Sequence, residues 1–380
     1  MADDATRAEL VDAVRPAFEL AARLHWTSHD PFDALLSPLG RPVQSASQLA
    51  ARVLVQAGKR SGTGFRRLLR VPEHEESKTF SDFLSAATML APDAAWAGEY
   101  VEDLSRRLGA ASTELPAGRG WGYAFPYASR YVNADRGVAN LYVTTAACQA
   151  LLDRHDLDGD RAALDAALDG CRFILDGLGW IEHGGRPWLR YWPGSESPVV
   201  NVQASGASLL ARAARVAGED RFADAADLAV EAVLSTQRHD GSWLYSADGR
   251  GNFVDGFHTG FTLQGLVEYT AQRAADRRLD LADAIGRGFA YFERHLLTED
   301  GLPRGYADGK PGLDGQNVAQ CIQTLVLCGG GPADRERAVR LWRSFMRGLL
   351  TGESAARSYP AIRWDLGPAV LATAHLSRSA

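Results

Sequence analysis

The chain of 380 residues is 46% hydrophobic and 23% charged, which supplies enough apolar material for one or two globular domains. Asp and Glu number 47 against 41 Lys and Arg, so the formal net charge is −6 and the pI is near 5.9. This balance argues against a broad nucleic-acid-binding face, which needs clustered cations.

The N-terminus and the cysteines predict the compartment. Residues 1–16 are rich in acids and lack the apolar core of a signal peptide, and no later window has the length and apolarity of a membrane span. The four cysteines lie in apolar runs without C-x-x-C spacing, which is typical of free thiols: Cys148, Cys171, Cys321 and Cys328. We therefore expect a cytoplasmic protein that does not insert into membranes.

The first 75 residues predict a helical extension. Helices are expected over 6–24, 45–57 and 62–69, and the prolines between 29 and 43 separate the first two. The basic run Arg66–Arg70 is interpreted as a solvated helix face that Glu73, Glu75 and Glu76 neutralise.

From there on the sequence has a repeat of about sixty residues. Six apolar, small-residue helices begin near Ser81, Asn140, Asn201, His258, Asn317 and Asp365, at intervals of 59, 61, 57, 59 and 48 residues. Segments with a one-sided apolar stripe lie between them, over 161–178, 219–237, 280–297 and 334–350. No strand pattern is evident.

Alternation of fully apolar and one-sided helices is typical of a double ring of helical hairpins. We predict an all-α fold, an (α/α)6 toroid or barrel that occupies residues 1–380 as a single domain, with residues 1–75 packed on it as an N-terminal helical extension.

In such a ring the residues just before the inner helices meet around one axis. Aromatic and polar side chains occupy these points and predict a substrate-binding pocket made of Trp121, Tyr123, Tyr127, Arg130, Tyr131, Asn140, Trp192, Asn201, Gln203, Trp243, Tyr306, Gln316, Asn317, Arg363 and Trp364. Further aromatic residues precede the same helices and are expected to face the pocket as well: Phe125, Trp188, Tyr191 and Tyr245. The alternative for Asn140, Asn201 and Asn317 is that each only caps a helix.

His258 is the histidine at the start of an inner helix, three residues after Asp255. A carboxylate at that spacing orients a histidine as an acid or base near neutral pH, although a purely structural histidine is the competing interpretation. Asp314, Asp365 and Asp33 are the other candidate acids. No metal-binding set and no cofactor motif is predicted.

Two resemblances follow from particular segments. The run STQRHDGSW at 235–243 resembles the Gln-and-Trp repeat of the terpenoid cyclase and protein prenyltransferase toroids, but their D-x-D-D acid motif and zinc ligands are missing.

Segments 29–37, 120–153, 240–261 and 300–325 together resemble a family of helical toroid proteins encoded in bacterial exopolysaccharide and capsule gene clusters, some of them labelled aminolevulinate dehydratases. The resemblance implies a glycan or glycan-precursor setting. This chain has Tyr127-Ala128 where the family pattern has Trp-Gln.

Three functions remain open at this point. In a carbohydrate-active enzyme (a sugar hydrolase, lyase or epimerase), Trp121, Tyr123 and Tyr127 stack on the sugar, Arg130 holds a carboxylate or phosphate, and His258 moves a proton with Asp255 or Asp314. An isoprenoid cyclase or transferase requires an aliphatic pocket. A non-catalytic binding protein of a biosynthetic cluster requires a filled axis. The sequence does not determine the oligomeric state.

Overall fold

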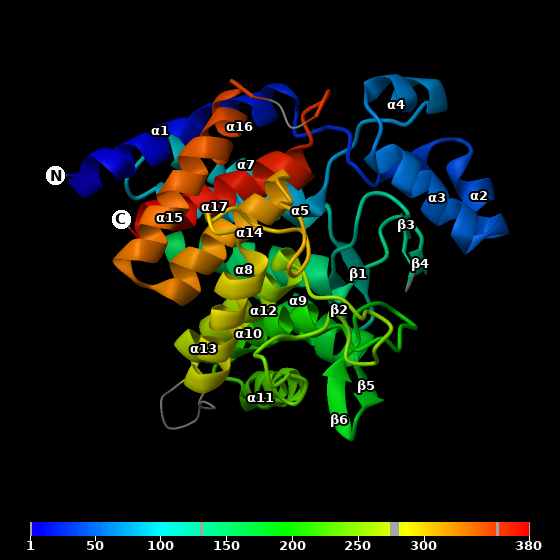
Figure 1. Cartoon of the computed structure of the whole chain (residues 1–380). Helices are drawn as coiled ribbons and strands as arrows, with labels where there is room; N and C mark the ends of the chain where they lie inside the picture. The colour runs from blue at the N-terminus through cyan, green and yellow to red at the C-terminus, as the bar shows by residue number, and fades with distance from the viewer. Residues whose placement is uncertain (1, 130–131, 274–280, 355–356, 380) are drawn as a thin grey trace.

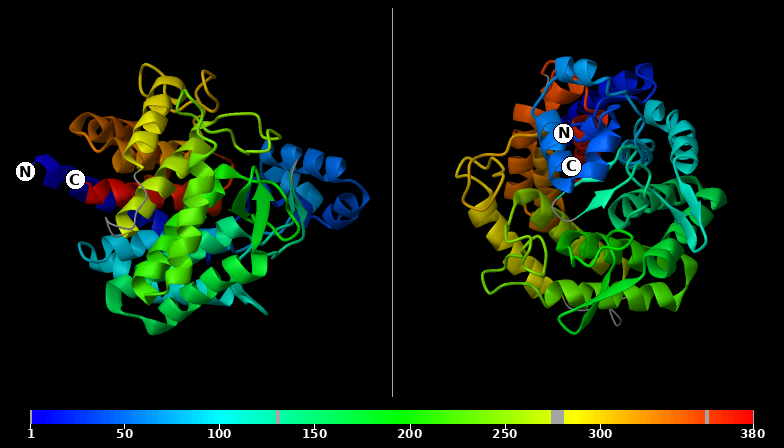
Figure 2. Two further views of the ribbon diagram at one scale, coloured as in Figure 1. Left: turned by 90° about the horizontal axis from the view of Figure 1, so that it is seen from below. Right: turned by 90° about the vertical axis from the view of Figure 1, so that its right-hand side faces the viewer.

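The computed structural model describes residues 2–129, 132–273, 281–354 and 357–379. Its centre is a ring of six helices, each of which contacts the next, with the last returning to the first (Figure 1; Figure 2, right). They are α5 (Ser77–Leu90), α8 (Leu141–Asp158), α10 (Val200–Ala217), α12 (Gly256–Gln272), α14 (Gly315–Thr324) and α17 (Gly367–Arg378). The predicted toroid and its six inner helices are confirmed.

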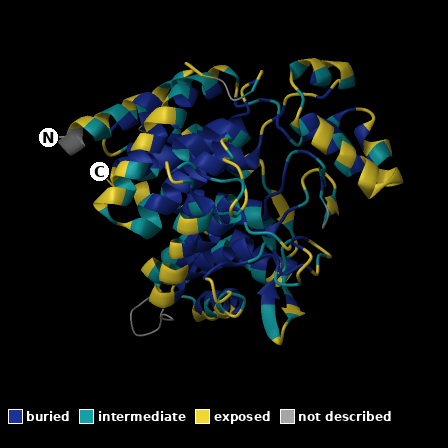
Figure 3. Ribbon diagram, in the orientation of Figure 1, coloured by how far each residue is buried: buried dark blue, intermediate teal, exposed yellow. Residues whose placement is uncertain are grey.

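An outer layer covers this ring. It consists of α7 (Val101–Ala110), α9 (Arg161–Arg172), α11 (Asp220–Leu234), α13 (Ala282–Tyr291) and α15 (Pro332–Leu341). Each buries one stripe and exposes the other, as Figure 3 shows for α13 and α15, because a helix between core and solvent needs only one apolar face. The sixth outer position belongs to α1 (Ala2–Arg23), which packs on α17, so the first helix of the chain completes the ring.

Short helical pieces extend these layers. Short π-helical segments continue α9, α13, α14 and α15: η2 (Phe173–Leu178), η3 (Phe292–Leu296), η4 (Leu325–Gly329) and η5 (Trp342–Met346). The remaining pieces are η1 (Asp33–Leu36), α6 (Ala95–Gly98), α16 (Arg347–Thr351) and η6 (Ile362–Leu366), which leads into α17.

Small residues allow the inner helices to approach one another. A Cβ on Gly265 of α12 would lie 2.5 Å from the carbonyl carbon of Ala204 on α10, so a larger side chain there would separate the two helices. The C-terminal ends of α8 and α10 are set by Gly159 and Gly218, whose φ angles of +77° and +71° are the left-handed caps that glycine favours.

Three antiparallel hairpins, which the sequence analysis did not predict, occupy loops before inner helices. They pair β1 (Thr113–Leu115) with β2 (Gly118–Gly120), β3 (Tyr127–Ala128) with β4 (Asn133–Ala134), and β5 (Trp180–His183) with β6 (Arg186–Leu189), where Trp180 faces Leu189. Strands of two to four residues are too short to show an alternating pattern, which is why the sequence did not reveal them.

After α1, the extension continues with α2 (Gly40–Ala46), α3 (Gln48–Lys59) and α4 (Thr63–Leu69). Helix α2 is the one that the sequence analysis did not predict. These three lie on the right-hand side of Figure 1, on the same side of the ring as the hairpins. Over the part of the chain that the structure describes, no helix has both the length and the apolarity needed to cross a bilayer.

Candidate functional site

A cavity of about 420 Å³ opens on the face of the ring where the inner helices begin, and we call it the mouth cavity. Twenty residues line it: Phe32, Lys59, Tyr123, Phe125, Tyr127, Tyr142, Tyr191, Asn201, Tyr245, Phe253, Asp255, Phe257, His258, Gly305, Tyr306, Asp314, Gln316, Asn317, Arg363 and Trp364. None of them is Leu, Ile, Val or Met. The volume falls in the range of roughly 300–1,000 Å³ that small-molecule sites occupy.

Stacked aromatic rings form two walls of the mouth cavity. On one wall the ring of Tyr123 stacks with that of Phe125 at 5.3 Å and with that of Tyr127 at 5.4 Å. On the other wall Tyr245 stacks with Phe253 at 5.1 Å. Flat aromatic faces held rigidly in this way suit the apolar faces of sugar rings.

His258 and Asp255 form a hydrogen-bonded pair at the start of α12. Asp255 caps the helix by accepting from the His258 backbone N–H at 2.7 Å, and its other oxygen lies 2.7 Å from Nδ1 of the imidazole. This places the Nδ1 proton toward the carboxylate and makes Nε2 the acceptor nitrogen. The ring edge also contacts Tyr245, with the centroids 4.7 Å apart. The geometry is that of an oriented general base.

The start of α14 supplies the neighbouring amides and a second carboxylate. Asp314 caps the helix by accepting from the Asn317 N–H at 3.2 Å. The Asn317 amide donates to the carbonyls of Arg304 and Gly312, so this side chain fixes the loop before the helix. On α10 the buried Oδ1 of Asn201 has no hydrogen-bond partner among the described residues, which leaves it available to a ligand.

Arg363 joins the cavity floor to the N-terminal extension. Its Nε and Nη2 donate to the two carboxylate oxygens of Asp30 at 2.6 and 2.7 Å, and both side chains are buried. Glu76 lies beneath this pair and accepts from the Ala124 N–H at 2.7 Å. Burial raises the pKa of Glu76 to about 8, although Arg363 opposes the shift.

Lys59 is the cation of the mouth cavity that has no acidic partner within ion-pair distance in the described residues. Its Nζ lies over the rings of Phe32 and Trp364 at 5.0 and 5.3 Å. Burial lowers the pKa of Lys59, and Asp314 opposes that shift. A desolvated ammonium between two aromatic faces suits a ligand carboxylate or phosphate.

Several predicted site residues lie outside the cavity lining. Trp121 is fully buried and donates to the Leu108 carbonyl, and Trp243 donates to the Val233 carbonyl. Both indoles pack between helices because a large ring fills the gap that a loop leaves in the core.

The side-chain amides of Asn140 and Gln203 form hydrogen bonds with the backbone. Asn140 caps α8 by accepting from the Val143 N–H, and Gln203 bonds both the N–H and the carbonyl of Leu189.

Three further predicted residues, Trp192, Asp365 and Asp33, are not part of the cavity lining. Trp192 supports Tyr127 by stacking at 5.6 Å. Asp365 pairs with Arg357 at 3.1 Å, and burial raises its pKa to about 6. Asp33 pairs with the buried Arg66. Arg130 and Tyr131 lie outside the described residues.

The sequence analysis missed several residues that the structure brings to this site. They are Phe32, Lys59, Tyr142, Phe253 and Phe257 in the lining, and Asp30 and Glu76 beneath it. The block HDPFDALLS (29–37) was the available signal, because it sets two carboxylates and an aromatic residue in a loop of the extension.

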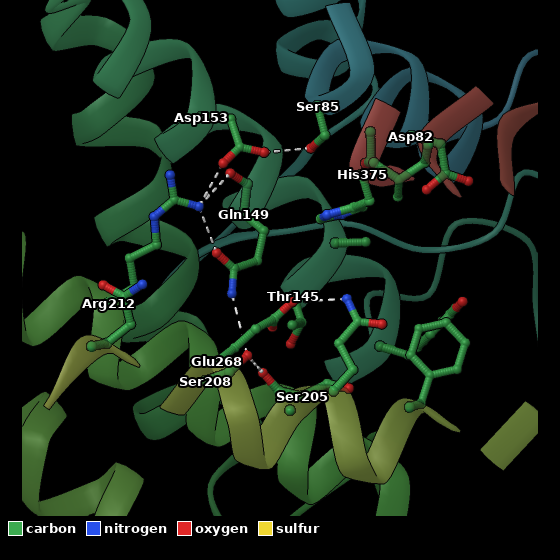
Figure 4. A pocket seen from close by; sticks show the side chains of 18 of the residues that line it. Asp82, Ser85, Thr145, Gln149, Asp153, Ser205, Ser208, Arg212, Glu268 and His375 are labelled. Atoms are coloured by element: carbon green, nitrogen blue, oxygen red, sulfur yellow. Dashed lines mark hydrogen bonds and ion pairs between the residues drawn. The ribbon is translucent and has the colours of Figure 1, made fainter. Parts of the chain in front are cut away.

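A second cavity of about 350 Å³ continues along the ring axis, and we call it the axial cavity. Tyr142 lines both cavities. In the axial cavity Ser85 donates to Asp153 at 2.6 Å, and Asp153 pairs with Arg212 at 2.7 Å (Figure 4). On α12, the side-chain amide of Gln264 donates to Glu268 at 2.8 Å. These hydrogen bonds and ion pairs satisfy the polar groups, so the side chains can remain inside the ring.

No group of three or more His, Cys, Asp or Glu side chains suited to a metal ion is found in the residues that the structure describes.

The fold has clear structural neighbours at low sequence identity. The cellobiose 2-epimerase of Bacillus thermoamylovorans superposes with a TM-score of 0.61 and 9% identity, over 81% of this chain and 90% of that chain. A family 76 α-mannanase of Bacteroides thetaiotaomicron gives 0.56 and 9%, over 80% and 85%. An unsaturated glucuronyl hydrolase specific for heparin gives 0.56 and 10%, over 80% and 85%.

Sequence comparison adds no relative: no protein-family model matches the chain, and no curated protein matches it. At 9–10% identity the structural neighbours show the fold, an (α/α)6 toroid, and leave the chemistry to be argued from the site itself.

Proposed function

We propose that this protein is a carbohydrate-active enzyme that binds a sugar, or a uronic-acid-containing glycan or precursor, in the mouth cavity and transfers a proton through His258. The observation that carries the proposal is the His258–Asp255 pair, whose Nδ1–Oδ2 distance is 2.7 Å, in a cavity walled by stacked aromatic rings. An oriented imidazole beside a sugar-sized platform supports acid–base chemistry on a bound sugar.

The lining favours a sugar over an isoprenoid. A prenyl chain is bound by aliphatic and aromatic surface, whereas the mouth cavity combines aromatic rings with Asp314, Asn201 and Gln316 and has no aliphatic side chain of Leu, Ile, Val or Met. The named activities of the structural neighbours, epimerisation of cellobiose and hydrolysis of mannan or glucuronides, agree with this choice. A glycan-biosynthetic setting, which the sequence resemblance implies, is part of the proposal.

The residues of the mouth cavity have distinct roles in this reaction. Tyr127 and Tyr245 stack on the sugar, Asn201 and Gln316 bond its hydroxyls, and His258 Nε2 accepts or returns the proton. Asp314 is the second acid–base group. Lys59 pairs with a carboxylate or phosphate of the substrate.

A ligand screen tests the proposal. Thermal shift is measured with saturated and unsaturated uronides, neutral disaccharides, sugar nucleotides and prenyl diphosphates on the wild-type protein and on Lys59→Met. We expect uronides to raise the melting temperature of the wild type and to lose that effect in Lys59→Met, while neutral sugars act on both alike. A shift with prenyl diphosphates alone supports the isoprenoid function, and binding of sugars without turnover of any supports a non-catalytic role.

A further inference from the structure

Helices α2, α3 and α4 carry a cationic surface on an otherwise acidic protein. Residues 34–72 contain seven of the 41 Lys and Arg of the chain and none of its 47 Asp and Glu. Arg41, Arg67 and Arg70 are exposed, and within the described residues none of the three forms an ion pair. This segment therefore presents uncompensated positive charge to the solvent.

The neutralisation of this surface by Glu73, Glu75 and Glu76, which the sequence analysis predicted, is wrong. Glu75 pairs with Arg107 of the outer layer at 2.6 Å, and Glu76 is buried below the mouth cavity. Glu73 lies 4.0 Å from His29. The three glutamates do not lie beside the arginines of α4, because the chain turns inward toward α5 directly after that helix.

The same helices expose apolar side chains. Leu39, Leu49, Val53 and Leu68 are 59%, 66%, 62% and 80% exposed, which makes them the four most exposed large aliphatic residues in the described part of the chain. Three of them border an open groove of about 650 Å³ between α2, α3 and α4, whose lining is apolar except for Ser47. Apolar patches of this kind mark interaction sites on monomeric proteins.

From these two observations we infer that α2–α4 dock on an anionic lipid surface, with the aliphatic side chains among the acyl chains and the arginines at the headgroups. Exposed aliphatic groups beside Arg residues on short helices are the pattern of an interfacial membrane contact. Nucleic acids and acidic glycans fit less well, because they are bound by aromatic stacking and hydrogen bonds rather than by leucine and valine.

The proposed docking segment adjoins the mouth cavity. Lys59 ends α3 and lines the cavity, and α3 also packs on β3, which carries Tyr127 (Figure 1). Lipid binding itself does not depend on the proposed reaction and is measured separately from it.

Sedimentation with vesicles tests the inference on the full chain. We expect binding to vesicles of phosphatidylcholine with about one third phosphatidylglycerol, little binding to phosphatidylcholine alone, and a loss of affinity as salt is raised. Arg41→Glu, Arg67→Glu and Arg70→Glu together reverse three exposed charges of this surface. Arg161→Glu, Arg238→Glu and Arg294→Glu, at exposed sites on the outer layer and its loops, are the control with the same change in net charge.

The first triple variant should lose well over tenfold in affinity, since each charge contributes roughly fivefold near an anionic surface, and the control should retain binding. Val53→Asn with Leu68→Asn should weaken binding without changing charge, and circular dichroism checks that both variants stay folded. Equal loss in the two triples, equal binding to both vesicle types, or binding only to an acidic polysaccharide, RNA or an acidic protein overturns the inference.

Discussion

Arg363 and Asp30 are 333 positions apart in sequence, yet they form a two-pronged ion pair at the floor of the mouth cavity. The pair connects η6, the segment before the last inner helix, to the loop that follows α1. Both side chains are nearly inaccessible to solvent, so each charge depends on the other for compensation.

Removing one partner of this pair should destabilise the folded protein. We expect Asp30→Ala to lower the free energy of unfolding by about 3–5 kcal/mol, because it leaves the guanidinium buried and unpaired. Urea denaturation measures the change. Glu9→Ala, which breaks the exposed pair with Arg343, is the control and should cost under about 1 kcal/mol. A small effect for Asp30→Ala would mean that another group compensates Arg363.

His258→Ala should reduce turnover of the sugar substrate by roughly 10²–10⁴-fold and change the free energy of unfolding little, because the ring lies in the cavity wall rather than in the core. His295 is the matched control, since its Nδ1 also lies beside an aspartate, Asp308, at 3.1 Å but outside the cavity. Kinetics of both alanine variants decide the question. A loss of stability in His258→Ala as large as its loss of activity would assign the residue a structural role.

The stability of the protein should fall as pH rises through the raised pKa of Glu76. The folded state keeps this carboxyl protonated up to about pH 8, whereas the unfolded chain releases the proton near its ordinary pKa of 4.5. Between these values the folded state binds more protons, so rising pH favours unfolding by an amount on the order of a few kcal/mol. Glu76→Gln should flatten the stability curve from pH 6.5 to 8, measured by denaturation at each pH. An unchanged slope would contradict the buried, protonated state.

The titration of His375, in the axial cavity, should make the protein less stable as the pH falls, which is opposite to the effect of Glu76. Burial lowers its pKa from 6.5 to about 4, so the unfolded chain binds the extra proton first as the solution is acidified. The stability contributed by neutral His375 is complete above about pH 6.5 and is lost as pH falls toward 4. His375→Gln should therefore be less sensitive to acid than the wild type in thermal unfolding. Parallel curves for the two proteins between pH 4 and 6.5 would refute the shift.

The periodic sequence determined the architecture of this protein. Apolar, small-residue stretches at near-sixty-residue spacing specify inner helices, and amphipathic stretches specify outer ones, because both patterns depend on residues three or four positions apart. His258 was identifiable for the same reason, since the helix-capping carboxylate of Asp255 is its neighbour in sequence.

Only the tertiary structure decided which polar and aromatic groups meet. Asp30 with Arg363, Lys59 over Trp364, and Glu75 with Arg107 join residues of different elements, and nothing local to either partner selects the other. The same limit explains Trp121 and Gln203, which stand at the predicted positions but turn into the packing between helices. The direction in which a side chain points there depends on which neighbour has space or an unsatisfied backbone group, and that is fixed only when the ring closes.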